Sequence, residues 1–437
     1  MIEQVKHRFS RTGDLFGQRV VIRDASLFVC GLRSLIDFPQ SVDLLRMQSL
    51  GTAESGPSVM DALLGLGYEL KPDDEDKACA EILNGMLVVI DEGSNRCLCL
   101  YPIRNQLSRS LSTPLMENNI RGSGTSFNED IDTNIGLLRK QFNTHDLGLT
   151  TYTFGSTVKS RVIVSYMKGS VEPKMLQALT EKLESQLNQG VANLQDLSNI
   201  LKFPKLSLVS RYNATELPQN ASRALRSGKI VLFVERFPFA LVVPSLITDM
   251  LVTEDDMNHP AVYMFLFRAI RLIGLITTLI FPGLYVALVS VNPDVLQFEL
   301  AHSIAMSRLD VPYPAIVETL ILLFVLELIM EAIIRLPSSI GPTVTMVGGI
   351  VLGQAVVTAK LVSNLLIIVL AAVTIANATV VGYQNSLTIR LFKYLLLFLS
   401  TIFGVLGLLS GLVIIVAYLS SVRTLDVPYL QLKPKGD

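Results

Sequence analysis

The chain has 437 residues, of which 50% are hydrophobic and 17% are charged, and its mean hydropathy is +0.46. This apolar content exceeds that of an ordinary soluble domain and indicates a membrane protein. The formal net charge is −1 and the basic residues are scattered. This excludes a strongly basic surface for nucleic acid, so we expect no nucleic-acid partner.

Hydropathy divides the chain into two halves. Up to about Leu241 charged and apolar residues alternate, whereas beyond Arg271 charges are sparse. No apolar run of signal-peptide length begins the chain, so we expect the first half on the cytoplasmic side. The predicted parts are a soluble domain over 1–236, an interfacial connector over 237–260, a helical transmembrane domain over 261–425 and a tail over 426–437.

Strand-like and helical runs alternate in the soluble half. Predicted strands cover 19–32, a hairpin within 83–100, then 161–168 and 229–235. Predicted helices cover 129–141, 172–189 and about 221–226. This alternation predicts a cytoplasmic α/β domain of one or two lobes.

The soluble half lacks a convincing catalytic or metal motif. Its four cysteines, Cys30, Cys79, Cys97 and Cys99, do not have zinc-site spacing, which predicts free buried thiols. The glycine-rich run 121–129 fits neither a P-loop nor a dinucleotide fingerprint, so a structural turn is favoured over a phosphate site. We therefore expect no enzymatic activity, no cofactor and no metal.

The second half contains apolar runs of membrane-span length. Runs free of charge cover 272–291, 361–381 and 394–422. Pro282 is predicted to kink the first run, and Arg390 and Lys393 lie just before the last. A fourth run, 316–334, contains acids. The glycine-rich segment 343–358 is short, so it either spans or re-enters, and the predicted count is four or five spans. Residues 238–251 are predicted to form an interfacial helix.

The acidic run is the strongest functional signal. Glu327, Glu331 and Arg335 follow at i, i+4 and i+8 and share one helical face, whereas Glu318 points roughly the opposite way. One interpretation has Glu331 paired with Arg335 to hold a helix bundle together. The other has Glu327 facing a lumen as part of an acidic ring, which favours cations.

Further polar and small residues are candidates in the same half. Gln354, Asn364 and Asn377 either line the same path or pair across helices. Close helix packing is predicted at small residues with four-residue spacing. These glycines are Gly348, Gly349, Gly353, Gly407 and Gly411.

Short motifs recur along both halves, from about Asp14 to Pro434. They include Ile120-Arg-Gly122 with Phe127, residues 133–139, 238–244 and 281–288, Val311-Pro-Tyr-Pro314 with Glu318, Arg335-Leu-Pro337, Gly353-Gln-Ala355 and Val427-Pro-Tyr-Leu430. With these motifs the chain resembles the GerA-type family of spore germination receptor A subunits.

This resemblance implies a subunit of a nutrient germinant receptor in the spore inner membrane. It implies a homo-oligomer that conducts monovalent cations, contacts membrane lipid and works with a transporter-like B subunit and a lipoprotein C subunit. It also makes three residues of the soluble motifs candidates for assembly of the soluble domain: Arg121, Asn134 and Arg139.

Two other functions compete with a channel. A secondary transporter would bind its solute at a broken helix, for which the segment 348–353 is the candidate, but the spans contain no convincing internal repeat. A scaffold that only anchors the other receptor subunits would conduct nothing.

Overall fold

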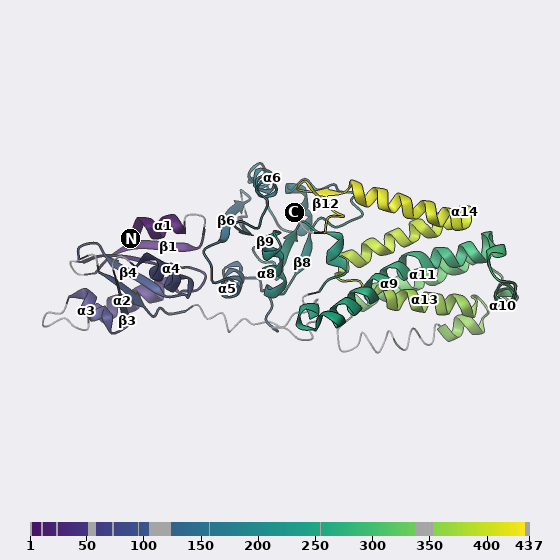
Figure 1. Cartoon of the computed structure of the whole chain (residues 1–437), viewed down its shortest axis with the longest axis horizontal. Helices are drawn as coiled ribbons and strands as arrows, with labels where there is room; N and C mark the ends of the chain where they lie inside the picture. Colours follow the sequence, from purple (N-terminus) through teal and green to yellow (C-terminus); the bar gives the residue numbers. More distant parts are fainter. Residues whose placement is uncertain are drawn as a thin grey trace.

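The computed structural model shows an elongated molecule with two β-sheets toward one end and long helices at the other (Figure 1). The described residues are 2–9, 12–22, 25–50, 58–71, 74–94, 96–104, 124–156, 158–253, 255–336, 346, 349 and 353–432. The predicted order of an α/β half followed by a helical half is therefore confirmed.

The first sheet has five antiparallel strands in the order β1-β2-β4-β5-β3. They are β1 (Leu15–Ile22), β2 (Ala25–Leu32), β3 (Gly67–Leu70), β4 (Leu87–Asp91) and β5 (Cys97–Leu100). Alternate residues of β2 enter different cores, Leu27 and Val29 on one face and Phe28 and Cys30 on the other. The first face is covered by α2 (Phe38–Leu50) and α3 (Val59–Leu64), the second by α1 (Ile2–Arg8) and α4 (Glu75–Leu83).

The second sheet is also antiparallel, in the order β6-β7-β9-β10-β8. Its strands are β6 (Leu147–Phe154), β7 (Ser160–Met167), β8 (Asn213–Thr215), β9 (Ile230–Val234) and β10 (Ala240–Val243). One face packs on α5 (Ile131–Gln141) and α8 (Pro218–Arg226), the other on α6 (Pro173–Glu184) and α7 (Leu194–Ile200). Each sheet has its own cores, as expected for two lobes.

The predicted interfacial helix over 238–251 is wrong. Its first part is β10, which pairs with β9 and β8 and has four buried residues. A short apolar run buried on both faces has no alternation that distinguishes a strand from a helix. Only short 3-10 helices follow before the helical half, η1 (Ile247–Met250) and η2 (Asp255–Asn258).

Long helices make up the second half. They are α9 (Ala261–Val286), which runs through Pro282 into the π-helix η3 (Ala287–Val291), then η4 (Pro293–Val295), α10 (Phe298–Arg308), α11 (Ala315–Arg335), α13 (Asn364–Asn377) and α14 (Tyr383–Ser421). Helix α9 packs against α13 and α14. It is the central helix of this half.

Helix α14 is folded into a hairpin. Gly404 has φ 59° and ψ −138°, so the helix is broken there into limbs 383–403 and 405–421. The rings of Phe392 and Tyr418 have centroids 6.0 Å apart. In one straight helix, 26 residues would separate them by about 39 Å. The prediction that 394–422 forms a single span is therefore wrong, because the run contains a turn that only glycine adopts easily.

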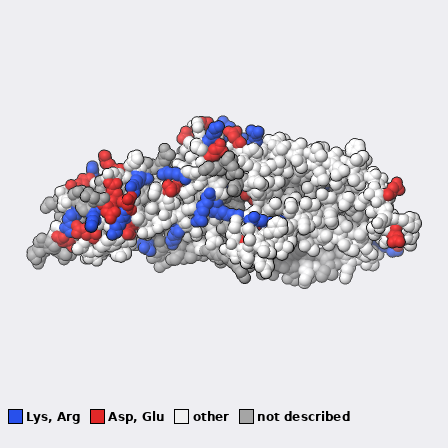
Figure 2. Space-filling model, in the orientation of Figure 1, with Lys and Arg blue, Asp and Glu red and all other residues white. Residues whose placement is uncertain are grey.

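Two of the described helical runs are long and apolar enough to cross a membrane by length and composition, Ala261–Val291 and Tyr383–Ser421, and the second consists of the two limbs of the α14 hairpin. Helix α11 has 21 residues and contains three glutamates, and α13 has 14 residues. The predicted count of four or five spans is therefore not established. The face in Figure 2 is nearly free of charge over the helices, and charged residues gather over the α/β half and at the far tip.

The last described residues return to the α/β half. After α14, the short strands β11 (Arg423–Thr424) and β12 (Val427–Pro428) pair with each other. Leu425 and Val427 are buried in the core of the second sheet, and the carbonyl of Tyr429 accepts a hydrogen bond from the amide of Ile247 at 3.1 Å. This return is a consequence of the hairpin at Gly404.

Candidate functional site

A carboxylate and two cations meet between helices of the apolar half. Glu327 of α11 accepts hydrogen bonds from Arg390 (Nη1 to Oε2, 3.1 Å) and Lys393 (Nζ to Oε1, 3.1 Å) of α14. The hydroxyl of Tyr394 donates to Oε1 at 3.3 Å. The side chains of Arg390 and Lys393 are only 10% and 6% exposed, and that of Glu327 is 29% exposed. The intramembrane carboxylate inferred from the sequence thus has partners within its own chain.

The positions of Arg390 and Lys393 differ from the prediction. They were expected to flank a span, but both are buried within the first limb of α14. With Tyr394 they fall at i, i+3 and i+4 and therefore share one helical face. A buried cation needs a nearby anion, and Glu327 supplies it across the helix interface.

A small pocket adjoins this charged cluster. Asn377, buried at the end of α13, accepts a hydrogen bond from Ser386 (Oγ to Oδ1, 3.2 Å) at its edge. Asn377 and Glu327 both line this pocket, whereas the other two polar candidates, Gln354 and Asn364, do not. The pocket is lined by Leu323, Leu326, Glu327, Met330, Val373, Thr374, Asn377, Arg390 and Lys393.

Glu331 forms the expected pair with Arg335. The Arg335 Nη2 lies 2.6 Å from Glu331 Oε1, with the side chains 77% and 54% exposed. The pair lies on the outward face of α11, which we define as Val317, Leu320, Ile321, Phe324, Leu328 and Glu331, all exposed. Glu327 is at the edge of this face and turns toward α14.

Glu318 belongs to a separate buried cluster near the other end of α11. Its carboxylate accepts hydrogen bonds from the hydroxyl of Tyr285 at 2.8 Å and from the amide of Ser363 at 3.1 Å. Arg308 Nε lies 3.5 Å away. Ser363 is the N-cap of α13, so this carboxylate stabilises the amino end of that helix.

The other helical candidates lie away from these clusters. Gln354 and Asn364 are exposed. Described atoms leave open space around Gly349 and Gly353, so helix packing there is not observed, and Gly348 lies outside the described residues. Close packing is found at Gly407 and Gly411, where an added Cβ would lie 2.1 Å from the Leu399 carbonyl oxygen and 2.5 Å from Leu396 Cδ2. These two glycines bring the limbs of α14 together.

The candidates in the α/β half have roles inside the chain. Buried Asn134 bonds to the backbone of Asn128, with Nδ2 to O at 2.7 Å. Arg139 of α5 makes a two-point ion pair with Asp14, at 2.8 and 3.1 Å, and thereby joins the second lobe to the first. Arg121 lies outside the described residues.

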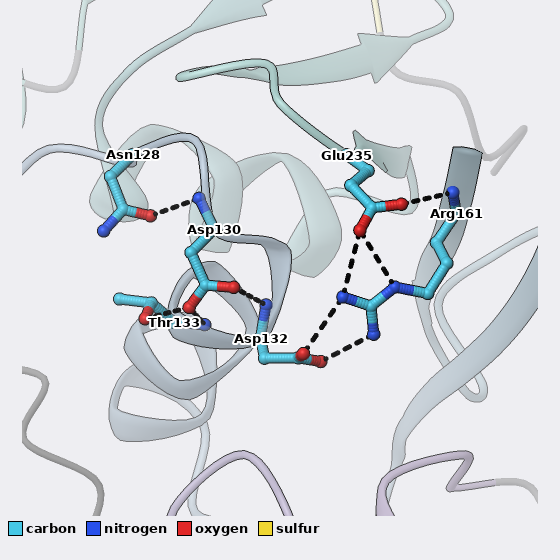
Figure 3. A network of polar contacts seen from close by, with 6 residues as sticks. All are labelled: Asn128, Asp130, Asp132, Thr133, Arg161 and Glu235. Carbon is cyan, nitrogen blue, oxygen red and sulfur yellow. Dashed lines mark hydrogen bonds and ion pairs between the residues drawn. The ribbon is translucent and has the colours of Figure 1, made fainter. Parts of the chain in front are cut away.

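A surface network around the start of α5 is shown in Figure 3. Asp130 is the N-cap of α5 and accepts from the amide of Thr133 at 3.0 Å. Arg161 of β7 lies between Asp132, at 3.1 Å, and Glu235, at 3.4 Å. This network fastens the start of α5 to the ends of the inner strands β7 and β9 of the second sheet.

Comparison with known proteins assigns the family. The family model described as Bacillus/Clostridium GerA spore germination protein matches residues 3–435. The chain belongs to the GerA family. This confirms the resemblance that the sequence motifs indicated.

GerA-family relatives align over most of the chain. Spore germination protein GerLA of Bacillus cereus is 28% identical over 98% of this chain and 88% of the relative. Spore germination protein A1 of Bacillus subtilis is 30% identical, over 82% and 74%. The uncharacterized membrane protein YfkQ of Bacillus subtilis is 29% identical, over 81% and 69%.

One solved structure is similar over the α/β half. It is the crystal structure of the N-terminal domain of the A subunit of the Bacillus megaterium spore germinant receptor GerK3. It is 17% identical, covers 56% of this chain and 94% of the solved chain, and has a TM-score of 0.40.

Sequence reasoning found only part of the charged cluster in this GerA-family chain. Glu327 was visible because an acid in an apolar run is rare. Arg390 and Lys393 were interpreted as flanking charges, although their position with Tyr394 on one helical face was a signal for a common partner. The ion pair between Arg139 and Asp14 joins residues 125 positions apart, and no local pattern indicates it.

Proposed function

We propose that this GerA-family chain is the A subunit of a nutrient germinant receptor in the spore inner membrane. In this proposal its copies assemble around a cation-conducting path, and it works with a transporter-like B subunit and a lipoprotein C subunit. Family membership supports the role in germination. The long apolar helices support the membrane location.

The observation that carries the pore proposal is the outward face of α11. It presents a stripe of apolar residues to the surroundings and ends in the exposed Glu331. In an oligomer, one such helix per subunit would surround an axis and place the exposed Glu331–Arg335 pairs around it. A cation on the path would compete with Arg335 for the Glu331 carboxylates, which would then act as a ring that attracts cations. Apolar residues along the rest of the face would form the narrow part of the path.

The charged cluster suggests a different role for Glu327 than the ring position expected from sequence. Its carboxylate is paired with Arg390 and Lys393, so its charge is compensated inside one subunit. We propose that this contact holds α11 against α14 and fixes the outward face toward the axis. Glu331 then becomes the first residue to test for ion attraction, and Glu327 the first to test for gating.

The experiment is potassium flux from liposomes containing the chain with its B and C partners, with and without nutrient. Glu331→Gln should lower flux by about fivefold, the effect of removing about 1 kcal/mol of attraction at the ion path. Glu327→Gln should alter the response to nutrient while assembly survives. Glu299→Gln, at an exposed acid of α10, is the matched control and should leave flux unchanged.

The same experiment separates the competing functions. Flux that is absent from a correctly assembled receptor would indicate a scaffold. Flux that saturates with a transported solute would indicate a secondary transporter. Unchanged flux in both Glu331→Gln and Glu327→Gln would remove α11 from the conduction path.

A further inference from the structure

The charged cluster in the apolar half contains more positive than negative charge. Arg390 and Lys393 both contact the single carboxylate of Glu327. The sequence has no Asp or Glu between Glu331 and Asp426. Of the elements packed around the cluster, α11 supplies Glu327, α13 supplies no ionisable group and α14 adds only the hydroxyl of Tyr394. Among the described residues, one of the two cations of the cluster therefore has no counter-charge.

Hydrogen-bond donors in the cluster are also in excess. Arg390 is about nine-tenths buried, yet its Nε has no hydrogen-bond partner among the described residues. Lys393 has three donor positions, and its described hydrogen-bond acceptor is the same Glu327 oxygen that Tyr394 contacts. Buried donors are costly to leave unpaired, so the site is suited to a further acceptor.

The pocket beside these donors gives that acceptor a place. Its polar lining is Glu327, Thr374, Asn377, Arg390 and Lys393, so two cations face one carboxylate there, and its apolar lining is Leu323, Leu326, Met330 and Val373. Apolar walls exclude water and strengthen the attraction between a cation and an anion. A small anion with a single negative charge would fit this pocket and would balance the uncompensated cation.

We propose that this pocket, between α11, α13 and α14, binds one small monovalent anion of the halide or carboxylate class, held by Arg390 and Lys393. The anion balances the cluster in the state in which Glu327 is paired. The proposal rests on the charge and geometry of the cluster and is independent of ion conduction. It is therefore tested by binding, not by flux.

The test uses the purified full chain in neutral detergent, with sodium chloride replacing sodium gluconate at constant ionic strength. Because the chain has no tryptophan, unfolding is followed by circular dichroism. Chloride at about ten times its Kd should raise Tm by about 2–4 °C. Equilibrium dialysis with radioactive chloride should show about one bound ion per chain.

Variants assign the binding to the pocket. Lys393→Met should abolish both the Tm shift and the bound chloride, whereas Lys360→Met, at an exposed lysine paired with Asp310, should leave both unchanged. Glu327→Gln removes the competing carboxylate and should tighten chloride binding by about tenfold. This gain supports the proposal even if Lys393→Met does not fold.

A lipid phosphate is a second source of the same charge. In chloride-free buffer, phosphatidylglycerol that stabilises the wild type but not Lys393→Met would identify the occupant as a lipid phosphate and would overturn the assignment to a halide or carboxylate. Absence of any chloride effect on Tm or of bound chloride would also overturn the proposal. Equal chloride binding by the wild type, Lys393→Met and Glu327→Gln would also overturn it.

Discussion

Arg139 shows how a single buried residue joins the two lobes of the α/β half. Its guanidinium pairs with Asp14 before β1, and Nη1 also donates to the carbonyl of Thr144 at 3.1 Å. Asp14 accepts a further hydrogen bond from Ser34 at 2.8 Å. The candidate assembly residue thus acts first within the chain, by fixing α5 against the first lobe.

Loss of this ion pair should destabilise the protein strongly. The side chains of Arg139 and Asp14 are 1% and 10% exposed, so Arg139→Met leaves a buried carboxylate without its cation. We expect a loss of about 3–5 kcal/mol in the free energy of unfolding, measured by urea titration with circular dichroism. Arg19→Met breaks the exposed pair with Glu92 and should cost less than about 1 kcal/mol. Equal losses in both variants would contradict the assigned role of Arg139.

The buried cysteines predict a pH dependence of stability. Burial raises the pKa of Cys30 and Cys97 to about 12 and of Cys99 to about 11. The unfolded chain releases these protons near pH 8.5, while the folded chain retains them to about pH 11–12. The stabilisation is therefore complete below pH 8.5 and declines as pH rises from there toward 12.

Thiol titration checks this prediction directly. At pH 8 the native chain should react slowly with a thiol reagent, and all four cysteines should react after unfolding. Unfolding curves between pH 8 and 11 should show falling stability. Rapid reaction of the native thiols at pH 8 would contradict the burial of these groups.

At the level of elements, the hairpin in α14 determines how the helical half is connected. Its turn is closed by Asn292, directly after η3, whose Oδ1 accepts from the amide of Val405 at 3.0 Å. Gly407 and Gly411 then let the second limb pack closely on the first. Gly404 and the side chain of Asn292 thus form the turn after which the chain runs back toward the α/β half.

Gly404→Ala tests the turn. The residue has φ 59°, and an added Cβ would lie 1.8 Å from Asn292 Oδ1. We expect a loss of at least about 1 kcal/mol in stability, measured by thermal unfolding. Gly65→Ala is the matched control, because Gly65 has φ −65° and open space around it, and it should be neutral or slightly stabilising. A stable Gly404→Ala variant would indicate that α14 tolerates another geometry.

The elements that the sequence predicted correctly are those with a clear pattern. Strands β7 and β9 are short apolar runs bounded by charged residues, α5 and α6 show helical spacing, and α11 is an apolar run of span length. Strand β10 was missed because Ala240–Val243 is apolar throughout, and the α14 turn was missed because Gly404 is surrounded by continuous apolar sequence. Contacts across long separations, such as Glu327 with Lys393, depend on packing that no single run of residues specifies.

At the scale of the whole molecule, the C-terminal strands connect α14 to the α/β half. Arg211 donates to the carbonyl of Arg423 at 2.7 Å, and the amide of Leu208 donates to the hydroxyl oxygen of Tyr418 at 3.0 Å. Together with Leu425 and Val427 in the core, these contacts link the second sheet to the end of α14. We expect movement of the α/β half to reach α14 and, through Glu327, α11.

This arrangement predicts the side of the membrane on which each end lies. Leu206→Cys in the α/β half and Leu432→Cys near the C-terminus, both exposed, should react with a membrane-impermeant maleimide from the same side. Glu299→Cys in α10 should react from the opposite side. The native cysteines are buried and give a low background. Labelling of Leu432→Cys from the side of Glu299→Cys would contradict the hairpin.

The central claim is that the assembled chain conducts cations when the receptor senses nutrient. The most direct test is the reversal potential of the current through the chain, reconstituted with its B and C partners, under a tenfold potassium chloride gradient. We predict a nutrient-dependent current that reverses near the potassium potential, about 59 mV in magnitude. Absence of current from assembled receptor, or reversal at the chloride potential, would contradict the account.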